Sequence, residues 1–189
     1  GGLERISPTG VHGPAIRFPV SLEASGSVSG GRDVRVDSFL LRAGKAESRG
    51  DGEGSIAGET LRLRGSLSIP AGSSADYGVG GPLAWEKVAG KWELSGPVSR
   101  LQGSASVSAT ALAVRALPPL PVLLKVDGFP KEALHFVVDV PAPGLKVTAV
   151  GTVASPFDRS RMSSEFTVTA REIDLAETAR WVSVVAKSL

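Results

Sequence analysis

Apolar and polar residues alternate with a period of two along most of this chain. The first run takes every second position at Ile16, Phe18, Val20, Leu22 and Ala24, with mainly polar residues between them. A β-strand places alternate side chains on opposite faces of a sheet, so this pattern predicts one apolar and one wet face. The same alternation recurs at Val34, Val36 and Leu40; Leu61, Leu63, Leu67 and Ile69; Trp92, Leu94 and Val98; Leu101, Ala105 and Val107; Val122, Leu124 and Val126; Leu134, Phe136, Val138 and Val140; Leu145, Val147, Ala149 and Val153; and Met162, Phe166 and Val168.

The wet face is clearest in one charged run. Lys45, Glu47, Arg49, Asp51 and Glu53 occupy successive odd positions, and only alanine, serine and glycine lie between them. A helix would spread these charges around its circumference, whereas a strand presents them all on one face. We therefore expect opposite charges on neighbouring strands to pair across this face.

Glycine and proline separate the apolar runs at intervals of about 10 residues, the spacing of an antiparallel meander. Only the last segment has helical spacing. Asp174 and Glu177 suit a helix start, and they are followed by apolar or small residues at Leu175, Thr178, Trp181, Val182 and Val185. The sequence thus predicts an all-β fold, an elongated and curved antiparallel sheet with a short C-terminal helix. We interpret residues 1–189 as a single unit, with a kink near 117–121, at the cluster Pro118 to Pro121.

Composition narrows the function classes. Hydrophobic residues make up 42% of the chain but aromatic residues only 5%, and the net charge is +2 with both signs interleaved. No basic patch interleaved with aromatic residues is present, so we expect no nucleic-acid partner. The chain has no cysteine, which excludes disulfides and thiolate metal sites. We expect the sequence to be a segment of a longer protein, with any membrane anchor outside it.

The residues that usually carry chemistry form no recognisable site. His12 lies in a segment rich in glycine and proline, and His135 lies on the polar parity of a strand. Neither has an acidic partner at metal-ligand spacing, which favours solvated imidazoles. No serine lies in a nucleophile-elbow pattern, and the segment from Gly50 to Gly58 lacks the Lys-Ser/Thr ending of a phosphate loop. We therefore expect no enzymatic activity, metal or cofactor.

The apolar faces leave two interpretations open. They form either the interior of a closed core, such as a sandwich, or the lining of an open trough that binds a ligand. An aliphatic face with few aromatic side chains suits flexible acyl chains, because each buried methylene contributes about 0.8 kcal/mol.

Two segments resemble the degenerate repeats of the AsmA and TamB families of bacterial envelope proteins. Residues 34–69 contain Gly-x-Gly at Gly52 and then Leu-x-Leu-x-Gly-x-Leu from Leu61. Residues 145–157 end in Gly-x-Val-x-x-Pro-Phe and are followed by Ile-Asp-Leu within Glu172 to Ala176. Pro118 to Pro121 and the passage from Tyr77 to Trp92 depart from the repeat.

The resemblance implies a taco-like β-groove with an apolar inner face, held in the periplasm and attached to a membrane. It implies a role in intermembrane lipid transport or in outer-membrane and envelope assembly, with phospholipid or another acyl-chain lipid as partner. Other envelope proteins are further expected partners, by pairing at a sheet edge. The alternative is a structural or adaptor sandwich module of a secretion or assembly machine. From the alternation we expect the groove to be lined by Leu61, Leu63, Leu67, Ile69, Leu134, Phe136, Val138, Leu145, Val147, Phe166 and Val168.

Overall fold

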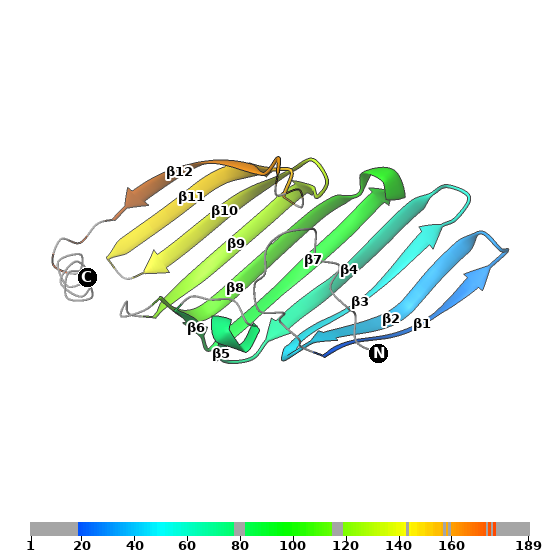
Figure 1. Ribbon diagram of the computed structural model, residues 1–189, viewed down its shortest axis with the longest axis horizontal. Helices are drawn as coiled ribbons and strands as arrows, with labels where there is room; N and C mark the ends of the chain where they lie inside the picture. Colours follow the sequence, from blue (N-terminus) through cyan, green and yellow to red (C-terminus); the bar gives the residue numbers. More distant parts are fainter. Residues whose placement is uncertain are drawn as a thin grey trace.

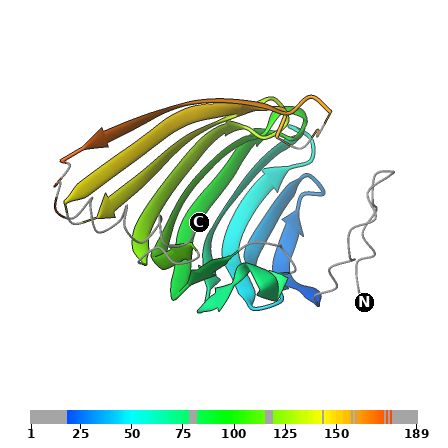
Figure 2. The same cartoon turned by 60° about the vertical axis from the view of Figure 1, so that its left-hand side comes forward.

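The chain forms one open, curved antiparallel sheet, which confirms the predicted fold class (Figures 1 and 2). The computed structural model describes residues 19–77, 82–114, 119–142, 144–156, 158, 160–172, 174 and 176. Ten strands follow one another across the sheet in the order β1-β2-β3-β4-β7-β8-β9-β10-β11-β12, and β5 and β6 lie off this path. The strands are β1 (Val20–Ser29), β2 (Asp33–Ala43), β3 (Ala46–Ser55), β4 (Thr60–Ile69), β5 (Gly72–Ser73), β6 (Leu83–Trp85), β7 (Lys87–Pro97), β8 (Gln102–Val114), β9 (Leu120–Phe129), β10 (Ala133–Ala142), β11 (Leu145–Ala154) and β12 (Ser163–Arg171).

Short connections hold the meander in register. The link from β1 to β2 contains Gly30 and Gly31, both in the left-handed region with φ of 57° and 64°. L-residues with a side chain rarely adopt this conformation, so glycine suits the tight reversal. The turn from β2 to β3 uses Gly44 in the same way, with φ of 60°.

The alternation predicted most strand faces but failed where the strand is irregular. The pairing of β2 with β3 shifts between Val36 and Phe39, because Asp37 and Ser38 form a bulge. Beyond the bulge Phe39 and Leu41 share a face with Val36, whereas Leu40 pairs with Arg49 on the opposite face. The assignment of Leu40 to the apolar face is therefore wrong, since one extra residue reverses the parity.

Four other predicted strand positions are also wrong. Lys45 lies in the turn before β3, Val98 begins the 3-10 helix η2 (Val98–Arg100), Leu101 follows that helix, and Met162 precedes β12. Ile16, Phe18, His12 and the residues beyond Ala176 lie outside the described residues, as do residues 117 and 118 of the predicted kink; of the rest, Pro119 precedes β9, and Leu120 and Pro121 begin it. At the predicted helix start, Asp174 Oδ1 accepts a hydrogen bond of 2.8 Å from the Ala176 N–H, and the Asp174 N–H donates to the Gly144 carbonyl at 2.7 Å.

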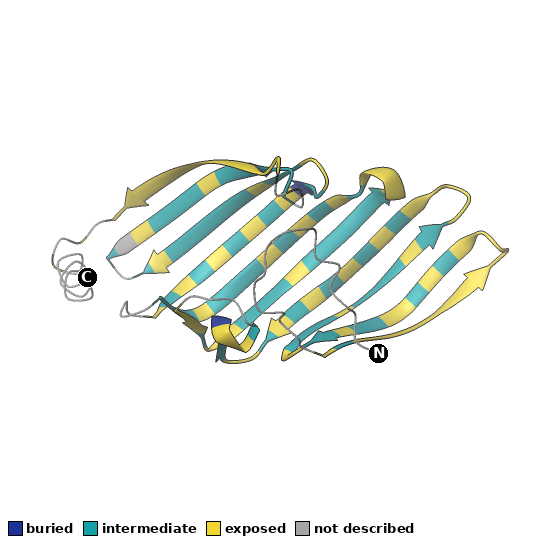
Figure 3. Cartoon of the chain, in the orientation of Figure 1, coloured by how far each residue is buried: buried dark blue, intermediate teal, exposed yellow. Residues whose placement is uncertain are grey.

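The sheet has no second layer among the described residues. None of their hydrophobic side chains is fully buried. β4 and β9 alternate between half-buried and exposed positions, whereas β7 and β10 are mostly half-buried and β1 and β12 are mostly exposed (Figure 3). The fully buried polar residue, Ser74 in the 3-10 helix η1 (Ser74–Tyr77), lies in the insertion between β4 and β7 rather than in the sheet. The two-layer sandwich considered above is thus not the architecture of the described part of the chain.

Candidate functional site

Strand pairing aligns the apolar residues in rows that cross the whole sheet. The central row crosses every strand of the main path through Ala24, Phe39, Gly50, Gly65, Trp92, Ala105, Val126, Phe136, Gly151 and Phe166. One flanking row contains Gly26, Val36, Gly52, Leu63, Leu94, Gly103, Gly128, Leu134, Val153 and Ser164, and the other contains Leu22, Leu41, Ser48, Leu67, Gly90, Val107, Leu124, Val138, Ala149 and Val168. No charged residue occurs in these rows. We call the surface that they share the apolar face, and its reverse the polar face.

The structure places ten of the eleven predicted groove residues on this one face. Leu63 and Leu134 lie in one flanking row, Phe136 and Phe166 in the central row, and Leu67, Val138 and Val168 in the other flanking row. Leu61, Ile69 and Val147 extend the face toward the strand ends, through pairing with Gly54, Val88 and Ala170. The backbone of Leu145 pairs with Ala142, at a position of the same parity as Val147.

Aromatic rings cover glycines in the central row. A Cβ added at Gly65 would lie 2.8 Å from Cζ2 of Trp92, one at Gly50 would lie 2.6 Å from Cζ of Phe39, and one at Gly151 would lie 2.7 Å from Cζ of Phe136. Each ring therefore lies on the backbone of the neighbouring strand, which compensates for the side chain that glycine lacks.

Two of these rings also contact each other. The ring centroids of Phe39 and Trp92 are 5.7 Å apart and their planes are tilted by 38°. The indole N–H of Trp92 donates a hydrogen bond of 2.9 Å to Ser48 Oγ, so the polar atom of the largest side chain on this face has a partner. The central row is thus an ordered, uncharged surface rather than a set of loose side chains.

The apolar rows are least covered at the two ends of the sheet. Leu22 and Val28 in β1 are 66% and 63% exposed, and Phe166 and Val168 in β12 are 62% and 56% exposed. Among the described residues, β1 and β12 each pair with a neighbouring strand on one side only, so each lacks the second neighbouring strand that an inner strand has. Over the described part of the chain, the apolar face is therefore most exposed at its two ends.

Ion pairs cross-link the polar face, as the alternation of charges predicted. Arg64 pairs with Asp51 at 3.0 Å, and Arg62 pairs with Glu93 at 3.1 Å. Arg42 connects three strands through Glu23 at 2.8 Å and Glu47 at 3.2 Å. Hydrogen bonds from Arg49 and Arg42 lower the pKa of Glu47 below its usual range, and the same contact with Glu47 raises the pKa of Arg42.

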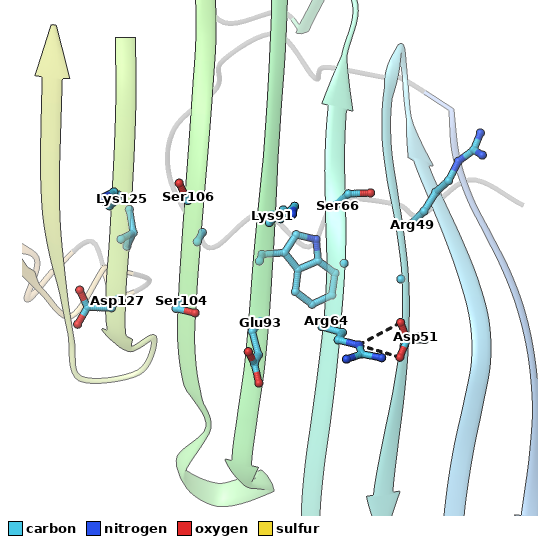
Figure 4. A pocket seen from close by; sticks show the side chains of 15 residues that line it. Arg49, Asp51, Arg64, Ser66, Lys91, Glu93, Ser104, Ser106, Lys125 and Asp127 are labelled. Carbon is cyan, nitrogen blue, oxygen red and sulfur yellow. Dashed lines mark hydrogen bonds and ion pairs between the residues drawn. The ribbon is translucent and has the colours of Figure 1, made fainter. Parts of the chain in front are cut away.

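A hollow of about 690 Å³ opens on the polar face over β3, β4, β7, β8 and β9 (Figure 4). Its labelled side chains form two rows across these strands, one with Lys125, Ser106, Lys91, Ser66 and Arg49, and one with Asp127, Ser104, Glu93, Arg64 and Asp51. Cations, carboxylates and serine hydroxyls are thus mixed, as on a hydrated surface. A second hollow of about 500 Å³ lies beside it, near Arg35 and Arg62. None of the eleven predicted groove residues lines either hollow.

The insertion between β4 and β7 packs at the ends of the strands. β6 pairs with both β5 and the last residues of β8, where Leu83 faces Val114 and Ala84 faces Ala113. The rings of Tyr77 and Trp85 lie 6.0 Å apart, and the Trp85 indole N–H donates to the Pro70 carbonyl at 2.9 Å. Burial and then the nearby Asp76 carboxylate raise the pKa of Tyr77. This small hairpin explains why the passage from Tyr77 to Trp92 departs from the strand repeat.

No arrangement typical of catalysis or metal binding is found in the described part of the chain. His135 Nδ1 lies 2.9 Å from Thr152 Oγ1, an exposed cross-strand contact. The described residues contain no group of three histidine or acidic side chains placed to hold a metal ion. They also include no helix with the length and hydrophobicity needed to span a membrane.

Comparison with protein-family models, with curated proteins and with solved structures finds no match to this chain. Any function therefore has to be inferred from the two faces of the sheet. Sequence reasoning placed Trp92 on the apolar parity but did not include it among the groove residues, and it missed Phe39 and the contact between the two rings. Their contact joins β2 to β7, and the signal that could have found it was the glycine placed opposite each ring.

Proposed function

We propose that this chain is a periplasmic β-groove module that shields acyl chains, in intermembrane lipid transport or in envelope assembly. The observation that carries the proposal is the apolar face. It runs uninterrupted across the ten strands of the main path, from β1 to β12, and the described residues place no second layer over it. A soluble protein rarely leaves so extended an apolar surface without a ligand or partner. The periplasmic location and a membrane attachment are proposed from the resemblance of residues 34–69 and 145–157 to the AsmA and TamB repeats.

The chemistry of the face favours acyl chains over other apolar ligands. Its rows consist mainly of aliphatic side chains, glycine and alanine, with aromatic rings confined to the central row and no charge in any row. Nine steps between strands of about 4.8 Å give each row a length of about 43 Å. Burial of a methylene group contributes about 0.8 kcal/mol, so a long chain lying on such rows gains enough to offset part of the cost of leaving a bilayer.

The proposal is tested by two substitutions at neighbouring positions of β10. Phe136 lies in the central row of the apolar face, and Val137 lies on the polar face, where it pairs with Lys125 and Val150. Phe136→Asp places a carboxylate among the proposed acyl chains, whereas Val137→Asp places the same group on the reverse of the same strand. We expect the first variant to lose at least tenfold in affinity for a fluorescent fatty acid, and the second to bind as the unsubstituted protein does.

Lipid extracted from the purified chain and identified by mass spectrometry provides the second measurement. We expect phospholipid or fatty acid to co-purify with the unsubstituted protein and with Val137→Asp, and to be depleted from Phe136→Asp. A protein that carries no lipid and does not bind the fluorescent fatty acid would contradict the proposal. Equal loss in both variants would show that the apolar face is not the binding surface.

A second candidate function, an adaptor that binds protein through a sheet edge, is favoured by the two exposed edge strands. β1 is exposed at every position except Val20, and β12 is exposed throughout. Such edges offer unpaired backbone N–H and C=O groups to an added strand.

A further inference from the structure

Within the described residues, the two edge strands carry few of the features that usually protect an edge from pairing, since their charges, such as Glu23, Glu165 and Arg171, lie on the polar face. β1 has ten residues and β12 has nine, and neither strand contains a lysine or a proline. No charge lies on the apolar face of either strand, where β1 carries Val20, Leu22, Ala24, Gly26 and Val28 and β12 carries Ser164, Phe166, Val168 and Ala170. Natural proteins commonly blunt long edge strands with such residues, because an unprotected edge recruits another strand.

The two edges are complementary in direction. Every neighbouring pair along the main path is antiparallel, and ten strands lie in the order β1-β2-β3-β4-β7-β8-β9-β10-β11-β12. The last strand therefore runs opposite to the first. When a second copy is placed beside the first with its apolar face on the same side, its β1 meets β12 in the antiparallel sense that every other pair in the sheet uses.

The side chains are complementary as well. If the rows continue from β12 into β1 of the second copy, Phe166 faces Ala24, Val168 faces Leu22 and Ala170 faces Val20. The ring of Phe166 then has a small residue opposite it, as the rings of Phe39, Trp92 and Phe136 have glycines. On the polar face no like charges are directly opposed, since Thr167 faces Glu23, and Arg42 already neutralises that carboxylate at 2.8 Å.

We propose that a second copy of this chain pairs its β1 with β12, so that the apolar rows continue from one copy into the next. The contact is head-to-tail, and repeated pairing extends the sheet rather than closing a twofold dimer. It covers Leu22 and Phe166, which are among the most exposed large hydrophobic residues of the described part of the chain. The inference does not depend on lipid binding. Edge pairing uses backbone N–H and C=O groups at the outer edges of β1 and β12, whereas lipid would contact the side chains of the apolar face.

Cysteine cross-linking tests both the contact and its register, since the chain contains no cysteine of its own. Ser21 and Thr169 are exposed on the polar face and lie in one row, through Arg42, Glu47, Ser68, Ala89, Ser108, Leu123, Asp139 and Thr148. Opposed residues of an antiparallel pair have Cα atoms about 4.5–5.5 Å apart, within the range that a disulfide spans. Under mild oxidation we expect the double variant Ser21→Cys with Thr169→Cys to form a ladder of dimers, trimers and longer species.

The matched control moves one cysteine by four residues on the same strand and face. Ser25→Cys with Thr169→Cys separates the thiols by roughly 13 Å along the strand, so we expect no ladder. Each single-cysteine variant tests for pairing of an edge with itself, which would give dimers alone. Circular dichroism checks that all variants keep their strand content.

Light scattering of the unsubstituted chain over a range of concentrations gives a measurement free of cross-linking. We expect the mean mass to rise with concentration. A constant monomer mass together with no ladder overturns the proposal, as does a ladder of equal intensity from the displaced pair, which indicates random collision. The cysteines lie on the polar face, so these outcomes leave the fatty-acid binding of the apolar face to be judged separately.

Discussion

Leu63→Asp distinguishes an open apolar face from one that is covered. Leu63 lies in the middle of the sheet, with Gly52 and Leu94 opposite it on the neighbouring strands. Its side chain covers the backbone of Gly52 and is half-buried, because the strands beside it, and not a second layer, provide its contacts. A carboxylate at this position therefore keeps access to water.

The expected cost follows from this partial burial. Full burial of a leucine side chain contributes about 1.5–3 kcal/mol, so a half-buried one contributes about 1–1.5 kcal/mol. Aspartate also fits a strand less well, by at most about 1 kcal/mol. The free energy of unfolding should fall by about 1–2.5 kcal/mol, which lowers Tm by about 2–10 °C for a chain of this size. In a closed core the same change would cost more than about 4 kcal/mol, because the carboxylate would be buried without a partner.

Urea unfolding followed by far-UV circular dichroism measures this difference. Ser66→Asp is the matched control, since Ser66 lies on the same strand but on the polar face, between Arg49 and Lys91. We expect the control to change the free energy of unfolding by less than about 0.5 kcal/mol. A Leu63→Asp protein that is unfolded, or that loses more than about 4 kcal/mol while the control is normal, would refute the reasoning and show that another layer covers the apolar face.

Two further predictions concern contacts that stabilise the sheet. Gly65→Val should lower the free energy of unfolding by about 1–3 kcal/mol in urea titrations, because the added Cβ would lie 2.5 Å from the Arg49 carbonyl oxygen and 2.8 Å from the Trp92 ring. Gly58→Ala should be nearly neutral, since its nearest neighbour would be at 3.5 Å; equal effects would contradict the packing of ring on glycine. The second prediction concerns Arg100, which donates two hydrogen bonds to Glu132, at 2.9 and 3.2 Å, and lowers the pKa of that carboxyl. A carboxyl with a lowered folded pKa stabilises the fold above its unfolded pKa and loses this contribution as pH falls through the folded value. Thermal unfolding of the unsubstituted protein and of Glu132→Gln therefore tests the pair. At about pH 6 the unsubstituted protein should be the more stable, and at about pH 3 this difference should disappear. A difference independent of pH would argue against the ion pair.

The fold was predictable because its main signal is local. A period of two can be recognised from the residues of a single strand. The pairing of charges between β3 and β4 follows from the same alternation. The errors also have local causes. The bulge at Asp37 and Ser38 reverses the parity of Leu40, and the helix η2 interrupts the run that begins at Trp92. Periodicity has no means of locating an extra residue in advance.

The candidate surface was predictable as a parity but not as a set of rows. Rows depend on the register between strands, and register depends on turns and bulges along the whole chain. Phe39 and Trp92 meet because three successive pairings carry the central row from β2 to β7, through Gly50 and Gly65. In the sequence alone, Gly50 is one of several small residues between charges, and nothing relates it to Gly65.

A single-layer sheet needs a source of order other than a core, and here both faces provide one. On the apolar face, rings lying on glycines hold adjacent strands together over the backbone, as Trp92 does over Gly65. On the polar face, ion pairs such as Arg64 with Asp51 connect the same strands from the other side. Cross-strand pairs of this kind stabilise a sheet by roughly 0.2–1 kcal/mol each. Because these contacts lie within the sheet, the apolar face is ordered by the described strands themselves, as an open binding surface would require.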